Sequence, residues 1–483
     1  MSLVSVPPPA TSTALHRTAI GGPPDRLSAR QPAAPWQQVA FWLVAVAGLA
    51  GGLLLPEDGR AVLLSVLSAP FLGLAGLRLV ALCLGTSATS GPPLRQCFTA
   101  PPPGGWPDYC VLVPLYKERA VLPGLVAALG ALDYPEDRLE IALVVEADDA
   151  ETRDAIGGLR LPHNMTVIEV PPGEPRTKPR ALNFALNRTG GEIVTVFDAE
   201  DVPEPHQLRE AAIALAAGGP RMGCVQARLN VYNRHDSFLT RQFTIEYTAQ
   251  FDRLLGALRR LGLPMPLGGT SNHFPRRVLE EVGGWDAWNV TEDADLGLRL
   301  ARLGYQVGVL EATTWEEAPA RLSIWKGQRT RWLKGWMQTW IVHMRRPREL
   351  LADLGPSGFL AFQLLMGGMV LSALVDPWFY LMLALGDGGG LFAMPGDALS
   401  RVLWVVGLLN IALGYAAAIA LGMASVVRRG WKALALHALL MPAYWLMVSL
   451  AAYRALGQLA TRPFYWEKTE HAARPPGAGT AQG

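Results

Sequence analysis

The stretch EIVTVFDAED, residues 192–201, begins with a short apolar run rich in β-branched side chains, 192–197, that leads directly into a group of carboxylates. Runs of this kind, closed by polar turn residues, are typical of buried strands. Alternation of such strands with helices predicts a mostly parallel sheet covered on both faces, and ligands of these sheets bind where loops leave the carboxyl ends of the strands. Comparable runs occur at 109–115, 139–145 and 165–170, with amphipathic stretches such as 119–132 and 179–188 between them.

The composition of the 483-residue chain is that of an integral membrane protein. Half of the residues are hydrophobic, 17% are charged, and the mean hydropathy is +0.20. This combination favours segments buried in lipid. The formal net charge of +2 creates no strong field, so no nucleic-acid partner is expected. The 4 cysteines lack the spacing of a metal site or a disulfide framework.

Apolar segments flank the predicted α/β domain on both sides. Asp376-Pro377 interrupts the first C-terminal segment, so we expect about five or six spans in total. The predicted parts are a disordered N-terminal tail (1–35), two transmembrane helices (36–86), a Pro/Gly linker (87–107), the α/β domain ending in an interfacial helix (108–345), about three or four transmembrane helices (346–460) and a C-terminal tail (461–483).

Two clues conflict on the side of the membrane where the chain ends. Arg428, Arg429 and Lys432 indicate a cytoplasmic loop, which favours three C-terminal spans and an external C-terminus. The charged residues of 462–471 instead indicate a tail held near the α/β domain. The sequence leaves both alternatives open.

Two carboxylate pairs carry the predicted chemistry. Asp198 and Glu200 project to one side of an extended chain, and their hard oxygens suit Mg²⁺ or Mn²⁺ shared with substrate phosphates. The alternative is a solvated acidic turn. Asp293 is predicted to be a general base, with Glu292 beside it as a substrate contact. The alternative for both is that they complement the dipole of a helix capped by Thr291.

Further polar residues are candidate substrate contacts. Asp148 and Asp149 follow a strand and can accept hydrogen bonds from a uracil or a ribose, or else cap the next helix. Lys178 at a helix start suits a phosphate, although a solvated basic turn is the commoner case. Glu118 lies in the polar turn after the strand at 109–115. His273 belongs to the loop GGTSNHF, whose glycines allow close approach of a ligand, but a single histidine is more often structural.

Residues 321–345 contain four tryptophans on one helical face, surrounded by lysines and arginines. The pattern predicts an amphipathic helix at the membrane interface. Within it, Gln328, Arg331 and Trp332 form a Q-x-x-R-W motif, in which Arg331 is expected to meet a diphosphate and Trp332 to offer a stacking platform for a sugar. The tryptophans are Trp325, Trp332, Trp336 and Trp340.

Taken in order, these pieces resemble the membrane-bound family-2 glycosyltransferases of the cellulose-synthase-like group. The resemblance implies a GT-A fold, with a Rossmann-like nucleotide-binding domain on the cytosolic face. It assigns uridine contacts to Asp148 and Asp149, the D-x-D metal site to Asp198 and Glu200, and the catalytic base to Asp293. Glu200 replaces the usual second Asp, and the D-D-G-S pattern after the second strand is absent. The matching residues are VPLYKE at 113–118, ADD at 147–149, KPRALN at 178–183, DAED at 198–201, GGTSNHF at 268–274, TED at 291–293 and QRTRW at 328–332.

The function implied by this resemblance is inverting transfer of a sugar from a nucleotide-diphosphate sugar, with UDP-glucose the expected donor, onto a growing β-linked polysaccharide. The expected location is the cytoplasmic membrane of a bacterium, with accessory export subunits as further candidate partners. One alternative is a non-processive transferase that makes a glycolipid. A second is a polytopic transporter with a nucleotide-binding domain, which the near absence of charges from 402–424 and 432–453 argues against.

Overall fold

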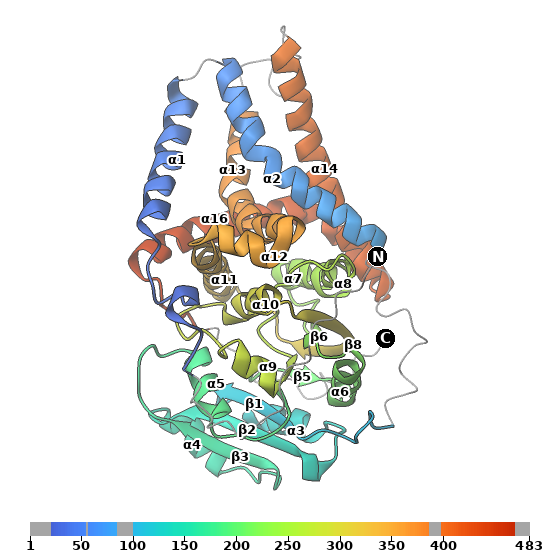
Figure 1. Cartoon of the computed structure of the whole chain (residues 1–483). Helices are drawn as coiled ribbons and strands as arrows, with labels where there is room; N and C mark the ends of the chain where they lie inside the picture. Colours follow the sequence, from blue (N-terminus) through green and yellow to red (C-terminus); the bar gives the residue numbers. More distant parts are fainter. Residues whose placement is uncertain (1–20, 55–56, 85–99, 386–397, 469–483) are drawn as a thin grey trace, which may run out of the picture.

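The computed structural model describes residues 21–54, 57–84, 100–385 and 398–468. An α/β domain lies at one end of the molecule, and long apolar helices extend from its other end (Figure 1). The N-terminal and C-terminal apolar helices lie together, so the domain is inserted between segments that are distant in the chain but adjacent in space.

The domain is built on a mixed sheet of eight strands. The four predicted strands are present and pair in parallel, with ends within one or two residues of the expected ones. The downstream half departs from a mostly parallel sheet, because β7 runs antiparallel to both of its neighbours. In spatial order the strands are β3 (Met165–Val170), β2 (Leu139–Glu146), β1 (Tyr109–Leu115), β4 (Ile193–Val196), β7 (Asn272–Pro275), β6 (Met222–Val231), β8 (Gln306–Glu316) and β5 (Val202–Pro203).

Helices cover both faces of the sheet, which explains why β1, β2 and β4 are mostly apolar. Successive side chains of a strand point to opposite faces. In β1, Cys110 and Leu112 accordingly enter one core cluster, whereas Val111 and Val113 enter the other. The helices of the domain are α3 (Leu122–Gly130), α4 (Ala150–Gly157), α5 (Lys178–Leu186), α6 (Gln207–Ala217), α7 (Phe238–Ala249), η4 (Gln250–Leu254), α8 (Leu255–Arg260), α9 (Arg276–Glu281), α10 (Glu292–Arg302) and α11 (Leu322–His343).

Helix α11 differs from the predicted interfacial helix, because protein surrounds most of it. Trp325 is 1% exposed, and its indole N–H donates to the Tyr444 hydroxyl at 3.2 Å. Lys334 is also buried, and its ammonium donates to the carbonyl of Tyr465 at 2.6 Å. Trp325 therefore packs against α16 (Met441–Thr461), whereas Trp332, Trp336 and Trp340 are half-buried.

Three segments are long and apolar enough to cross a membrane in the described part of the chain: Pro347–Pro377, Val405–Arg428 and Lys432–Thr461. Helices α1 (Pro35–Leu54) and α2 (Glu57–Leu84) occupy the two predicted N-terminal spans. The remaining helices are α12 (Pro347–Phe362), η5 (Gln363–Gly368), α13 (Met369–Leu385), α14 (Ala398–Arg428), α15 (Lys432–Ala435), η7 (Leu436–Leu440) and α16 (Met441–Thr461).

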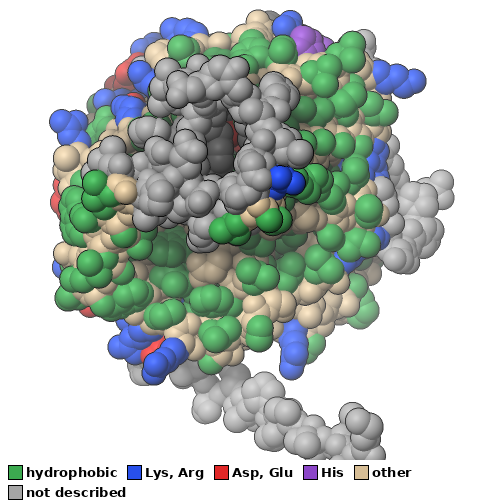
Figure 2. Space-filling view, turned by 90° about the horizontal axis from the view of Figure 1, so that it is seen from above, with side chains coloured by type: hydrophobic (Ala, Val, Ile, Leu, Met, Phe, Trp, Pro, Cys, Tyr) green, Lys and Arg blue, Asp and Glu red, His purple; other side chains and the backbone are tan. Residues whose placement is uncertain are grey.

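The end of the molecule formed by these helices presents mainly hydrophobic side chains, with Lys and Arg mostly around its edge (Figure 2). Asp376-Pro377 does not end a helix, since α13 runs through it to Leu385. The backbone is interrupted instead at Gly355, whose φ of 67° lies in the left-handed region that favours glycine.

Both terminal segments contact the domain. Residues 21–34, expected within a disordered tail, are described as far as α1, and Ser28 and Ala29 are buried. At the other end, residues 462–468 return to the domain, where Lys334 and Gln338 donate to their backbone carbonyls. The structure therefore follows the second of the two conflicting clues, that of a tail held against the domain.

Candidate functional site

A cavity of ≈ 430 Å³ opens at the carboxyl ends of the central strands and extends to the helices α11, α13 and α16. Nine of the residues singled out in the sequence line it, although they come from five separate parts of the chain. They are Glu118, Lys178, Asp198, Glu200, Glu292, Asp293, Gln328, Arg331 and Trp332. Asp148, Asp149 and His273 are not among the lining residues.

Acidic residues after β4 form one wall of the cavity. The Lys178 ammonium forms an ion pair with Asp198 and donates to the carbonyl of Gly269 at 2.9 Å. Burial alone would lower the pKa of Lys178, but the carboxylates of Asp198 and Glu292 outweigh it and raise that pKa. Lys178 is therefore charged, and it already neutralises part of the acidic wall.

The residues of this wall fit a divalent cation. Burial and the neighbouring carboxylates raise the pKa values of Asp201 and Glu316 well above the usual range. Asp201 Oδ1 and Glu316 Oε1 are both buried without a hydrogen-bond partner. A cation held by Asp198 and Glu200 would relieve this excess of negative charge. No group of three or more His, Cys, Asp or Glu ligands occurs in the described segments, so substrate oxygens would have to complete the coordination.

Glu292 and Asp293 begin α10 at the opposite side of the same space. The Asp293 carboxylate accepts from the backbone N–H of Ala294 at 2.8 Å. Burial raises the pKa of Asp293, and burial together with Asp293 raises the pKa of Glu292 to about 7 despite the opposing effect of Lys178. Raised pKa values bring carboxylates nearer to the range in which a general base is effective.

Gly269 separates the two acidic groups. A Cβ atom at this position would lie 3.3 Å from Asp293 Oδ2 and 4.0 Å from Asp198 Oδ2. A side chain here would therefore fill the space between the predicted base and the predicted metal ligand. This close approach is the physical reason for a glycine in the loop.

Helix α11 supplies the cationic and aromatic wall. Gln328 Oε1 and Arg331 Nε are buried without hydrogen-bond partners, which leaves them able to bind an oxyanion or a hydroxyl. The Trp332 indole stacks on Tyr247 with ring centroids 6.0 Å apart and an interplanar angle of 15°. The Arg329 guanidinium lies 4.7 Å from the Trp332 centroid and forms a bidentate ion pair with Glu246. These contacts hold the Trp332 ring rigidly at the cavity.

The three predicted contacts outside the cavity have other partners. Asp149 caps α4 by accepting from Thr152 N at 3.2 Å, and it also accepts from Lys117 N. Asp148 forms an ion pair with Arg176, a residue that lines the cavity. His273 is fully buried between strands, with Nδ1 2.6 Å from the Tyr109 hydroxyl, and burial lowers its pKa to about 3. It is therefore neutral, and its surroundings are those of a structural histidine.

Several lining residues were not among the candidates singled out in the sequence. The C-terminal segment contributes Trp466, whose ring lies 5.4 Å from the Arg331 guanidinium, and Lys468, which pairs with Glu118 at 3.1 Å. Only the charges of the tail hinted at these contacts. The other unexpected residues are Tyr116, Glu146, Arg176, Glu246, Tyr247 and Glu316.

Comparison with known proteins shows what the domain is similar to. Residues 107–335 match the family model described as Glycosyltransferase like family 2. The chain is 30% identical over 232 residues to "Probable glycosyltransferase YdaM" of Bacillus subtilis, which covers 47% of this chain and 55% of that protein. It is also 30% identical over 276 residues to "Beta-monoglucosyldiacylglycerol synthase" of Synechocystis sp., which covers 54% of this chain and 55% of that protein.

The chain spans about half the length of these curated relatives. A solved structure, "Mannosyltransferase PcManGT from Pyrobaculum calidifontis in complex with GDP-Man and Mn2+", has a TM-score of 0.52 at 21% identity and covers 81% of this chain and 99% of that one. At this identity, the likeness shows a similar fold. Residues 107–335 thus match a glycosyltransferase family 2 model and have a GT-A-like fold, followed by apolar helices, which confirms the predicted fold class.

Proposed function

We propose that the protein transfers a hexose from a nucleotide-diphosphate sugar to an acceptor hydroxyl with inversion at the anomeric carbon. The observation that carries this proposal is the meeting of Asp293, Asp198 and Arg331 in one cavity, although they belong to different elements. The relatives named as glycosyltransferases and the neighbour's complex with GDP-Man and Mn2+ support it.

Each wall of the cavity has a role in this reaction. The Asp293 carboxylate takes the proton of the attacking hydroxyl, so the acceptor is proposed to lie beside it in the cavity. Lys178 and Arg331 supply positive charge next to the leaving diphosphate. A Mg²⁺ or Mn²⁺ ion held by Asp198 and Glu200 would neutralise further charge on that diphosphate when bound. Attack from the face opposite the leaving group converts an α-linked donor into a β-linked product.

The acceptor is proposed to be a growing β-glycan. The cavity carries a fixed aromatic platform in Trp332, and the apolar C–H face of a sugar ring can pack on an indole. A lipid acceptor is the second candidate, because Met369 and Val448 at the far side of the cavity belong to segments apolar enough to cross a membrane. The named glycolipid synthase among the relatives favours the same candidate.

One experiment tests both the reaction and the acceptor. Membranes containing the full chain are supplied with a panel of UDP- and GDP-sugars, and release of the nucleoside diphosphate is measured. UDP-glucose is the expected donor. The labelled product is then sized: a polymer supports the β-glycan, and a product extracted into organic solvent with one or two sugars supports the glycolipid. Absence of release with every donor would contradict the proposed transfer.

The proposed location is the cytoplasmic membrane of a bacterium, with the domain in the cytosol where nucleotide sugars are made. Arg346 and Arg348, beside the first C-terminal span, agree with this orientation. Gly158 is exposed on the domain, so Gly158→Cys provides a reporter. In intact cells, an impermeant thiol reagent is expected to leave it unlabelled, and labelling from outside would reverse the orientation.

A further inference from the structure

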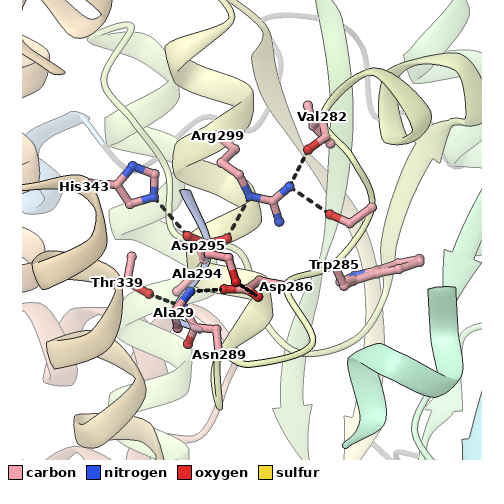
Figure 3. Close-up of polar contacts among 12 residues, drawn as sticks. Ala29, Val282, Trp285, Asp286, Asn289, Ala294, Asp295, Arg299, Thr339 and His343 are labelled. Carbon is pink, nitrogen blue, oxygen red and sulfur yellow. Dashed lines mark hydrogen bonds and ion pairs between the residues drawn. The ribbon is translucent and has the colours of Figure 1, made fainter. Parts of the chain in front are cut away.

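The segment Asp25–Gln37, which we call the N-terminal clasp, lies against the loop 283–291 that leads into α10. The Ser28 hydroxyl donates to Asp286 Oδ1 at 2.8 Å, and the backbone N–H of Ala29 donates to Asp286 Oδ2 at 2.6 Å. Figure 3 shows Ala29 next to Asp286, close to the other polar residues of this region. Both carboxylate oxygens of Asp286 are thus occupied by one short segment that is 257 or 258 residues away in sequence.

Arg345 binds the backbone of the N-terminal clasp. Its guanidinium donates to the backbone carbonyls of Ser28, at 2.9 Å, and of Arg26 and Gln31. The side chain of Gln37 donates to the carbonyl of Ile341 at 2.9 Å, close to the end of α11. Since α1 begins at Pro35, the clasp connects the first apolar helix directly to the region around α10 and α11.

The loop held by the clasp is also fixed by α5 and α11. Asn183 exchanges two hydrogen bonds with the backbone of Trp285, at 2.7 and 2.9 Å. The amide of Asn289 donates to the Thr339 hydroxyl at 3.0 Å, and Val290 N donates to Gln338 Oε1 at 3.2 Å. These contacts restrain the loop at Trp285, Asn289 and Val290, ahead of Glu292 and Asp293.

A second buried carboxylate continues this frame within α10. Asp295 is fully buried; its Oδ1 lies 2.9 Å from His343 Nε2, and its Oδ2 accepts from Arg299 Nε at 2.7 Å. Arg299 in turn donates to the carbonyls of Val282 and Gly284 at 2.6 and 2.8 Å. Figure 3 shows His343, Asp295 and Arg299 joined by hydrogen bonds, with the separate contact of Ala29 and Asp286 nearby.

We propose that the N-terminal clasp positions the catalytic end of α10, with Ser28 and Asp286 as positioning residues for Asp293. The expected effect on turnover rests on the proposed function, in which Asp293 is the catalytic base. The mechanical reason is that loop 283–291 has partners on α5 and α11, while the clasp adds a hydrogen bond from outside the domain to each oxygen of Asp286. Within the loop, Asp286 Oδ1 also accepts from Trp288 N. Loss of the clasp would free that loop, and a shift of about 1 Å at a catalytic group can cost about 100-fold in rate.

The test uses the full chain in lipid nanodiscs and compares Ser28→Ala and Asp286→Asn with wild type. Asp25→Asn is the matched control, since Asp25 is exposed on the same segment. Hydrogen–deuterium exchange of residues 287–300 is expected to speed up in both test variants and not in the control. Turnover is expected to fall about tenfold with the donor Kd within about twofold, because only positioning is lost. Ser28→Thr keeps the hydroxyl and should restore both readouts.

The exchange measurement does not depend on sugar transfer. If wild type transfers no sugar, the proposed function fails while the exchange of 287–300 still reports on the clasp. If wild type transfers sugar and Ser28→Ala matches it in exchange and turnover, the clasp proposal is overturned and the function stands. A fall in melting temperature with an unchanged turnover of the folded protein would overturn it as well, since it would show a contribution to stability alone.

Discussion

Asp293→Asn is the substitution that tests the proposed chemistry most directly. The side-chain amide has nearly the same shape as the carboxylate, and its oxygen can still accept the 2.8 Å hydrogen bond from Ala294 N. The start of α10 should therefore keep its structure. What the variant loses is the basic oxygen that faces Gly269 and the acidic wall.

The expected loss follows from the role of a general base. Proton transfer by a positioned side chain contributes about 10²–10⁴-fold in rate, which corresponds to about 2.7–5.4 kcal/mol of barrier. Donor binding should change little, because Arg331, Lys178 and Trp332 remain in the cavity. Turnover is thus expected to fall by that factor while the donor Kd stays within about threefold, consistent with loss of an interaction made in the transition state.

The assay measures nucleoside diphosphate release and labelled product in nanodiscs, with donor Kd determined by isothermal titration. Asp137→Asn is a matched control, since Asp137 is an exposed aspartate on η3 (Glu136–Arg138), away from the cavity. Turnover of Asp293→Asn within a few-fold of wild type would refute the reasoning. Asp293 would then serve only the helix N-terminus, as the alternative reading of the sequence has it.

Three other outcomes are expected. Removal of divalent cations with excess EDTA should abolish transfer, and added Mn²⁺ or Mg²⁺ should restore it. The reason is that Asp198 and Glu200 line the cavity where a cation can bind the diphosphate of the donor. Full turnover after metal removal would contradict this role. Glu292→Gln should shift the acidic limb of the pH–rate profile to lower pH. Turnover needs Asp293 deprotonated, and the negative charge of the coupled Glu292, whose pKa is raised to about 7, favours a proton on the pair. An acidic limb that stays at the same pH would disprove the coupling. Trp332→Ala should shorten or abolish the glycan product more than it weakens donor binding. Trp340→Phe changes a residue outside the cavity and should leave product length unchanged. Equal effects of the two variants on product length would contradict the stacking role of Trp332.

Local pattern was sufficient for the elements that carry the chemistry. Buried strands such as 139–146 and 193–196 are mostly apolar because both faces of the sheet are covered, so they stand out against the polar turns that follow. Acids at the ends of parallel strands meet at one edge of the sheet, which is why Asp198 and Glu118 could be expected at a common site. The apolar helices were equally visible, since length and hydrophobicity are properties of a segment by itself.

Contacts between residues distant in the chain decided the surroundings of the other candidate residues. Asp148, Asp149 and His273 have the residue types of a binding site, and the structure gives them an arginine, a helix N-terminus and a tyrosine hydroxyl as partners, so their role as substrate contacts stays a prediction. The tryptophans of α11 satisfied the pattern of an interfacial helix, but that pattern does not distinguish lipid from another helix as the apolar neighbour. Only packing against Tyr444 showed that Trp325 faces protein.

The two ends of the chain show why local pattern cannot supply such contacts. Ser28 meets Asp286, and Lys468 meets the carbonyl of Lys117 across 351 positions. A polar residue in a short terminal segment looks the same in sequence whether water or a buried carboxylate is its partner. Which one it meets depends on where the sheet and the apolar helices bring distant backbone together, and burial then makes an unpaired polar group costly enough to select the partner.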